Sequence, residues 1–141
     1  MKQKLLFLFI ACTIGAYGYA QCGKKNMLSA TGCESLNKQN EVMMKDTQRL
    51  TTIVYDTKII ELVSEFTTLN GTIDSIFCNW KTPYSEGAEI IKCKLTFEGG
   101  EIWPATLTIT GKGEKLSLLV DIEHPDAGIM RFTLDKFEEK K

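Results

Sequence analysis

The sequence predicts a mainly β or α+β domain, in which an N-terminal helix covers an antiparallel β-meander of five to seven strands. Two observations predict this fold. Apolar and polar residues alternate over most of residues 72–135, and glycine-containing turn sequences separate the alternating runs. An antiparallel sheet of this kind has one apolar face that must be covered. The cover is either the helix or the sheet itself, closed as a small up-and-down β-barrel.

Residues 1–20 have the three parts of a secretory signal peptide: a basic start, an apolar run at residues 5–11, and small residues up to Ala20. The apolar run is shorter than the roughly 20 residues that cross a bilayer, so we predict cleavage after Ala20 and no stable membrane span. The alternative is a lipid anchor at Cys12, in a context that resembles the bacterial lipoprotein pattern. Residues 21–141 are then a single periplasmic or extracellular domain.

The composition is that of one ordinary globular domain, with 43% hydrophobic and 25% charged residues in a chain of 141. Loss of Lys2 and Lys4 with the signal peptide leaves 15 Lys and Arg residues against 18 Asp and Glu residues, a net charge of −3. Nucleic acid binding requires a cationic surface that displaces counterions. Basic residues cluster only at Lys24–Lys25 and Lys140–Lys141, so we expect no nucleic acid partner.

Four cysteines follow residue 20, and an even number in a small exported domain is typical of disulfides. Of the three possible pairings we favour Cys22–Cys33, which would close a short polar loop, with Cys78–Cys93, which would join two β-like runs. The chain has no Cys-x-x-Cys sequence and no histidine near a cysteine. A structural role is therefore favoured over metal binding or a catalytic thiol, and we expect no metal site and no cofactor.

Residues 21–35 are polar and contain glycine, which predicts a loop closed by the first disulfide. The following segment contains good helix formers, and Leu36, Met43 and Leu50 repeat every seven residues. We therefore predict a helix over about residues 34–49.

The next part of the chain is ambiguous. Residues 51–55 are β-branched or aromatic and predict a strand. Residues 56–69 fit both the spacing of a helix and the alternation of a strand. We favour a strand, because Asn70–Gly71 follows as a hairpin turn signal.

Five further runs place apolar side chains on one face of a sheet, with turns at Gly99–Gly100, at residues 111–113 and at residues 124–128. Their apolar positions are Ile76, Cys78 and Trp80; Ile91, Cys93, Leu95 and Phe97; Trp103, Ala105, Leu107 and Ile109; Leu116, Leu118, Val120 and Ile122; and Met130, Phe132 and Leu134.

The longest irregular connection predicted in the β region runs over residues 80–88 and carries the candidate binding residues Trp80, Lys81, Tyr84 and Glu86. Aromatic residues on loops are frequent at protein contacts, which favours this loop as a binding surface. The alternative is that Trp80 caps the core while Tyr84 lies on the surface.

His124 is the only histidine and lies in an acidic segment with Asp121, Glu123 and Asp126. It could act as a general base or as a metal ligand. However, Pro125 and Asp126 suit a turn, and the segment has only a fragment of a calcium-binding pattern. No serine or cysteine nucleophile stands in a recognisable motif, so we favour a solvated turn.

Together these observations predict an exported binding protein rather than an enzyme. Its expected partner is a protein, such as a toxin or hydrolase that it inhibits or gives immunity against. One alternative is a carrier that holds a small apolar ligand in a barrel cavity. Another is a small hydrolase that uses His124. A helix packed on the apolar face would leave no room for a ligand and would exclude the carrier.

Overall fold

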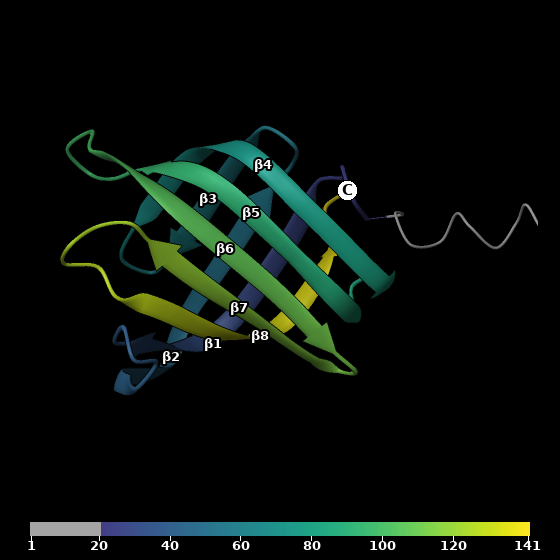
Figure 1. The fold of residues 1–141 in the computed structure, drawn as a ribbon, viewed down its shortest axis with the longest axis horizontal. Helices are drawn as coiled ribbons and strands as arrows, with labels where there is room; N and C mark the ends of the chain where they lie inside the picture. The colour runs from purple at the N-terminus through teal and green to yellow at the C-terminus, as the bar shows by residue number, and fades with distance from the viewer. Residues whose placement is uncertain (1–20) are drawn as a thin grey trace, which may run out of the picture.

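The computed structural model describes residues 21–141, so the predicted signal peptide and the alternative lipid anchor at Cys12 lie outside the described residues. Eight antiparallel strands close into one barrel, because each strand pairs with the next and β8 pairs with β1 (Figure 1). Within residues 21–141 there is no helix, and hence none of the length and apolar character that crosses a membrane. The strands are β1 (Asn26–Leu36), β2 (Val42–Tyr55), β3 (Ile59–Ser64), β4 (Thr68–Thr82), β5 (Glu86–Thr96), β6 (Ile102–Lys112), β7 (Lys115–Ile122) and β8 (Ile129–Glu139).

The alternative prediction of a small β-barrel is confirmed, whereas the N-terminal helix and the meander of five to seven strands are wrong. Residues 34–49 form the end of β1, a turn and the first half of β2, and the predicted loop at residues 21–35 contains most of β1. The seven-residue repeat marks no buried face, since Leu36 is buried while Met43 and Leu50 are 68% and 59% exposed. Helix preferences are weak per residue, and strand pairing outweighs them here.

A turn built on Asn37 interrupts the segment that was expected to be helical. The Asn37 Oδ1 atom accepts hydrogen bonds from the backbone nitrogens of Gln39 and Glu41, both at 2.9 Å. Asn40 has a φ of 62°, a left-handed conformation that asparagine tolerates better than most residues. Local side-chain hydrogen bonds therefore reverse the chain direction between β1 and β2.

The strand interpretation of residues 56–69 is confirmed over β3, but Asn70–Gly71 is not a hairpin turn. Both residues lie inside β4, where Gly71 pairs with Ile60 of β3. A Cβ atom at Gly71 would lie 2.5 Å from the backbone oxygen of Lys94. Glycine is thus needed here because the neighbouring strand lies too close for a side chain at this position.

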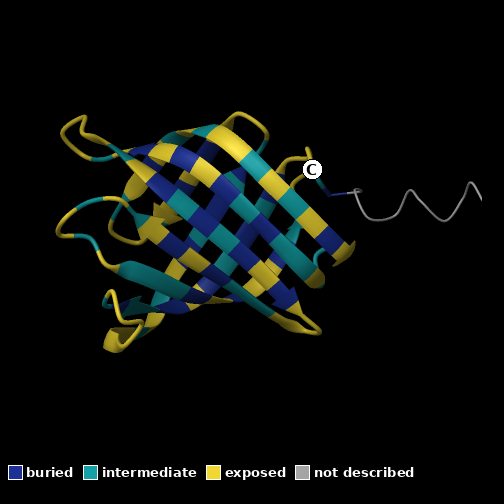
Figure 2. Ribbon diagram, in the orientation of Figure 1, coloured by how far each residue is buried: buried dark blue, intermediate teal, exposed yellow. Residues whose placement is uncertain are grey.

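Side chains fill the interior of the barrel, and buried and exposed residues alternate along each strand (Figure 2). The predicted apolar positions of β5, β6, β7 and β8 point inward, as the period of two requires. The largest fully buried side chains are Tyr55, Leu28, Ile53, Ile60, Ile91, Leu95, Leu107, Ile109, Leu118, Gln21, Glu89 and Val120.

One disulfide joins Cys22 to Cys78 with a Cα–Cα distance of 6.1 Å, so both predicted pairings are wrong. Cys33 lies well along β1, and a strand that rises roughly 3.3 Å per residue carries it far from Cys22. Cys93 stands opposite Ile73 rather than Cys78 in the register of β4 and β5. Cys33 and Cys93 are free and buried.

The shortness of β3 leaves parts of both neighbouring strands without a partner on one side. β3 has 6 residues, whereas β2 has 14 and β4 has 15. β3 pairs with β2 only over residues 51–55 and with β4 only over residues 68–72. Among the described strands, residues 42–50 of β2 pair only with β1, and residues 73–82 of β4 pair only with β5.

Candidate functional site

The free side of β4 is bridged by the segment that precedes β1. The disulfide attaches Cys22 of this segment to Cys78 of β4. Next to it, Gln21 is fully buried, and its Oε1 atom accepts a hydrogen bond from the backbone nitrogen of Tyr84. This end of the barrel is therefore closed by a covalent bond and by a buried polar contact.

A buried carboxyl group, Glu89, lies beneath this closure on the inner face of β5 and is 1% exposed. The Tyr55 hydroxyl donates to its Oε1 atom and the Trp80 indole nitrogen donates to its Oε2 atom, both at 3.0 Å. Asn26 extends the network, because its Nδ2 atom donates to the Tyr55 hydroxyl at 3.4 Å and its Oδ1 atom accepts from the Tyr84 hydroxyl at 2.7 Å. These residues form the closed-end network.

Burial dominates the electrostatics of the closed-end network. Burial raises the pKa of Glu89, and the hydrogen bonds from Trp80 and Tyr55 and the nearby Gln21 amide counteract only part of this rise. Burial and the adjacent Glu89 also raise the pKa of Tyr55, so this hydroxyl remains a donor. Two donors held on a buried acid fix the geometry of the barrel end and stabilise it.

The four predicted binding residues lie together around the β4–β5 turn, but they differ in exposure. Trp80 belongs to β4, is 2% exposed and packs against Phe137 with 5.5 Å between ring centroids. The Tyr84 ring meets the same Phe137 edge-on at 4.8 Å. Lys81 and Glu86 point into solvent and pair with each other, with 3.6 Å between Nζ and Oε1. The connection between β4 and β5 is three residues long and is therefore shorter than the loop predicted over residues 80–88.

His124 lies in the β7–β8 connection at the opposite end of the barrel. Its Nδ1 atom accepts a hydrogen bond from the backbone nitrogen of Asp126 at 3.0 Å, as expected for a turn. Its ring meets Trp103 edge-on with 4.3 Å between centroids. Within residues 21–141, no three His, Cys, Asp or Glu side chains are grouped so that they could hold a metal ion.

The β1–β2 hairpin projects past the barrel wall at the end of the barrel that carries the β7–β8 connection, at the lower left of Figure 1. A bulge redirects the hairpin, because Thr31 pairs with Leu50 whereas Cys33 pairs with Asp46. Gly32 has a φ of 85°, and a Cβ atom there would lie 2.6 Å from the Asp46 backbone oxygen. The Asp46 side chain caps the extra residues of β2 by accepting from two backbone nitrogens at 3.0 Å.

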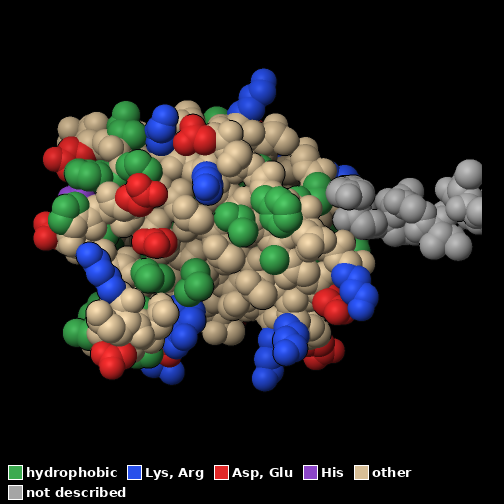
Figure 3. Space-filling model, viewed as in Figure 1, with side chains coloured by type: hydrophobic (Ala, Val, Ile, Leu, Met, Phe, Trp, Pro, Cys, Tyr) green, Lys and Arg blue, Asp and Glu red, His purple; other side chains and the backbone are tan. Residues whose placement is uncertain are grey.

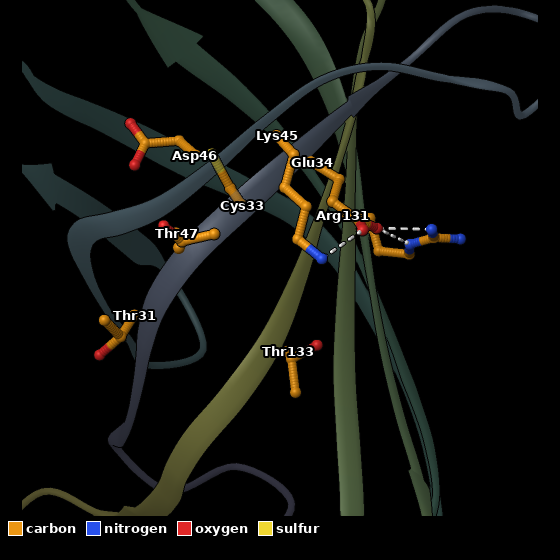
Figure 4. A pocket seen from close by; sticks show the side chains of 9 residues that line it. Thr31, Cys33, Glu34, Lys45, Asp46, Thr47, Arg131 and Thr133 are labelled. Carbon is orange, nitrogen blue, oxygen red and sulfur yellow. Dashed lines mark hydrogen bonds and ion pairs between the residues drawn. The ribbon is translucent and has the colours of Figure 1, made fainter.

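A small hollow of about 150 Å³ lies over this bulge (Figure 4). Glu34 is at its centre and accepts a hydrogen bond from Arg131 Nε of β8 at 2.8 Å. Lys45 of β2 approaches the other carboxylate oxygen of Glu34 at 3.7 Å. The Arg131 hydrogen bond is the main cause that lowers the pKa of Glu34. Three strands are joined here by charged side chains that satisfy one another, so the hollow itself presents few free groups to a ligand.

The outer half of β2 presents both an unpaired backbone edge and apolar side chains. Val42, Met43 and Met44 are consecutive and each is about half exposed or more. Further along, Leu50 and Val63 line a shallow depression on the outer wall. An unpaired strand edge with exposed apolar residues is a template for pairing with another chain. We call residues 42–46 of β2 the open edge.

Sequence reasoning missed both Glu89 and the open edge. Glu89 precedes Ile91 by two residues, so extending the alternation of Ile91 and Cys93 backwards would have placed it on the inner face. The open edge has a weaker signal. It depends on β3 being much shorter than β2, and strand length is not encoded by alternation alone.

Comparison of the chain with protein-family models, with curated proteins and with solved structures finds no match. The class is therefore defined by the structure: an eight-stranded up-and-down β-barrel whose one end is closed by a disulfide and whose β1–β2 hairpin carries an open edge. The disulfide indicates an oxidising environment.

Proposed function

We propose that the protein is an exported binding protein that is cleaved after Ala20 and takes up a strand of a protein partner along its open edge. The partner is a toxin or hydrolase of the same compartment, which the protein inhibits or gives immunity against. The observation that carries the proposal is the half of β2 that has a strand on one side only.

The chemistry of the open edge suits a polypeptide. Backbone groups along a free strand edge give affinity for an extended segment, and the flanking side chains give specificity. Val42, Met43 and Met44 supply apolar contacts, and methionine adapts to partners of different shape. On the face shown in Figure 3, Lys and Arg side chains are interspersed with Asp and Glu side chains. Such a mixed surface favours a protein over a polyanion.

Neither alternative function receives comparable support. A carrier needs interior space, whereas inward-facing residues such as Leu107 and Ile109 are fully buried in a packed core. A hydrolase needs a base that is free to accept a proton, whereas Nδ1 of His124 already accepts a hydrogen bond within its own turn. We therefore propose recognition without catalysis.

The test is titration of the processed protein against purified toxins and hydrolases exported by the same organism, followed by calorimetry. The double variant Met43→Lys with Met44→Lys places charges on the open edge and is expected to weaken binding at least tenfold. Leu119→Lys is the matched control, since Leu119 is a partly exposed residue on β7, which is paired on both sides. Equal affinity for the two variants would overturn the assignment of the open edge.

A further inference from the structure

Gln21 is the first residue after the proposed cleavage site, and it lies buried at the closed end of the barrel. Its Oε1 atom accepts a hydrogen bond from the backbone nitrogen of Tyr84. Its Nε2 atom is also buried but donates to no partner among the described residues. A buried amide nitrogen without an acceptor costs free energy, because folding has removed its hydrogen bonds to water.

The acceptor group beside this nitrogen is the buried carboxyl group of Glu89. The Gln21 side chain helps to lower the pKa of Glu89, but its Nε2 atom is not within hydrogen-bond geometry of the carboxyl group. The two oxygen atoms of Glu89 already accept from Tyr55 and Trp80. The structure thus uses the oxygen of the Gln21 amide and leaves its nitrogen unused.

We propose that Gln21, once proteolysis makes it the N-terminal residue, is converted to pyroglutamate. The inference rests on the proposed export and cleavage after Ala20. In the reaction the α-amine nitrogen attacks Cδ, the new N–Cδ bond closes a five-membered lactam, and the Cδ–Nε2 bond breaks. Nε2 leaves as ammonia with one hydrogen from the amine, so the step needs neither an oxidant nor a reductant.

Cyclisation keeps the Gln21 side-chain oxygen, which accepts a hydrogen bond in the structure, and removes the amide nitrogen, which donates none. Oε1 becomes the lactam oxygen and is still able to accept a hydrogen bond, whereas the lost atom is the unpartnered Nε2. Cyclisation also removes the positive charge that cleavage would create on the α-amine. Burial of an unpaired charge is costly, so loss of this charge favours the closed end of the barrel.

The experiment is mass spectrometry of the full chain after expression with its own residues 1–20 in a secreting bacterium. The freshly purified and reduced protein is expected to have the mass of residues 21–141 less about 17 Da, the mass of ammonia. Pyroglutamyl peptidase is expected to remove the modified residue from the unfolded chain. Gln21→Asn is the control, because its amide is one methylene shorter and cannot close a five-membered lactam.

The possible outcomes separate this inference from the proposed function. A chain that begins at Gln21 with its full mass overturns the cyclisation and leaves export and cleavage standing. A chain that begins elsewhere, or that keeps residues 1–20, overturns both the cleavage site and the cyclisation. Treatment of an uncyclised chain with glutaminyl cyclase before refolding is expected to raise its Tm by about 3–5 °C. An unchanged Tm would contradict the structural reason for the modification.

Discussion

β2 and β4 lie on either side of the short β3, and both extend past it, but only one of the resulting free edges is covered. On the β4 side, the disulfide attaches the N-terminal segment to the strand, and Gln21 of this segment accepts a hydrogen bond from Tyr84 in the β4–β5 turn. On the β2 side, the strand keeps an open edge with exposed apolar residues. The same cause, a strand of 6 residues between longer ones, thus has two outcomes.

The difference shows how a closed barrel can be stable and still keep a place for strand pairing. Free strand edges promote aggregation, and proteins commonly protect them. Here the protected edge lies over the closed-end network, where loss of a contact would expose the core. The unprotected edge lies on a projecting hairpin that Glu34, Lys45 and Arg131 tie to the wall. The proposed strand pairing and the main stabilising contacts therefore lie at different ends of the molecule.

The largest effect on the free energy of unfolding is expected from Trp80→Ala at the closed end. Trp80 fills the closed end, packs on Phe137 and donates to Glu89, so its removal leaves a cavity and an unsatisfied acceptor. We expect the free energy of unfolding to fall by about 3–5 kcal/mol in urea denaturation. Lys81→Ala, at the exposed neighbouring position, is expected to change it by less than about 0.5 kcal/mol. Similar losses for both variants would show that the closed end is not a stability centre.

The second largest effect is expected from removal of the disulfide by Cys22→Ala with Cys78→Ala. The bridge spans a sequence separation of 56 residues, and its loss restores the entropy of that loop to the unfolded chain, at a cost of about 2–4 kcal/mol. A reducing agent is expected to destabilise the wild-type protein by a similar amount and to leave the double variant unaffected. If the reductant destabilises both proteins equally, the Cys22–Cys78 disulfide does not stabilise the covered edge of β4.

A smaller, pH-dependent effect is expected at Glu89. Its folded-state pKa is raised above the ordinary value of 4.5, so its contribution to stability is fully present below that pH. The contribution is lost as the pH rises through the folded-state pKa, because the unfolded chain then releases a proton that the folded chain retains. Wild-type stability is therefore expected to fall, relative to that of Glu89→Gln, as the pH increases from about 4 to 8.

The comparison of the two proteins at each pH isolates Glu89 from other carboxyl groups. Glu34, Asp46 and Asp56 have lowered pKa values and give the opposite slope, but they are common to both proteins. Chemical denaturation across the pH range measures the difference. A difference that stays constant with pH would mean that the buried group does not titrate abnormally.

The smallest effect on folding is expected at the open edge. Met43→Lys with Met44→Lys changes exposed residues on the projecting hairpin, so the free energy of unfolding is expected to move by less than about 0.5 kcal/mol per site. Thermal unfolding of the double variant, measured alongside the binding assay, tests whether its effect on binding is separate from any effect on stability. A large loss of stability would show that the hairpin, rather than being a surface for a partner, supports the barrel.

Much of the β structure could be predicted because alternation reports directly on which face is buried. Ile91, Cys93 and Leu95 face inward as the pattern requires, since burial imposes a period of two. Residues 34–49 misled the prediction, because helix preference is a local property whereas pairing with β1 is a property of the whole fold. The disulfide depended on the same long-range pairing and could not be deduced from the spacing of cysteines.

The candidate site was less predictable than the fold. The alternation of Ile76, Cys78 and Trp80 predicts the inward position of Trp80, but the sequence does not show that the Tyr84 ring contacts Phe137. Glu89 looks like a surface residue by composition, and only its register places it inside the barrel. The open edge arises from the relative lengths of three strands, a quantity set by the closure of the whole sheet.

The pairing of β1 with β8 also affects the order of folding events during synthesis. Asn26 stands opposite Glu139, so the first strand finds its second neighbour only when the end of the chain has arrived. Contacts between such distant segments form late, because a long loop must close before they can contribute. A chain emerging during synthesis would thus remain an open sheet until its last strand was available. Loss of the last residues from Phe137 onward would remove the pairing of β8 with Asn26–Leu28 and would open the β1–β8 seam at that end.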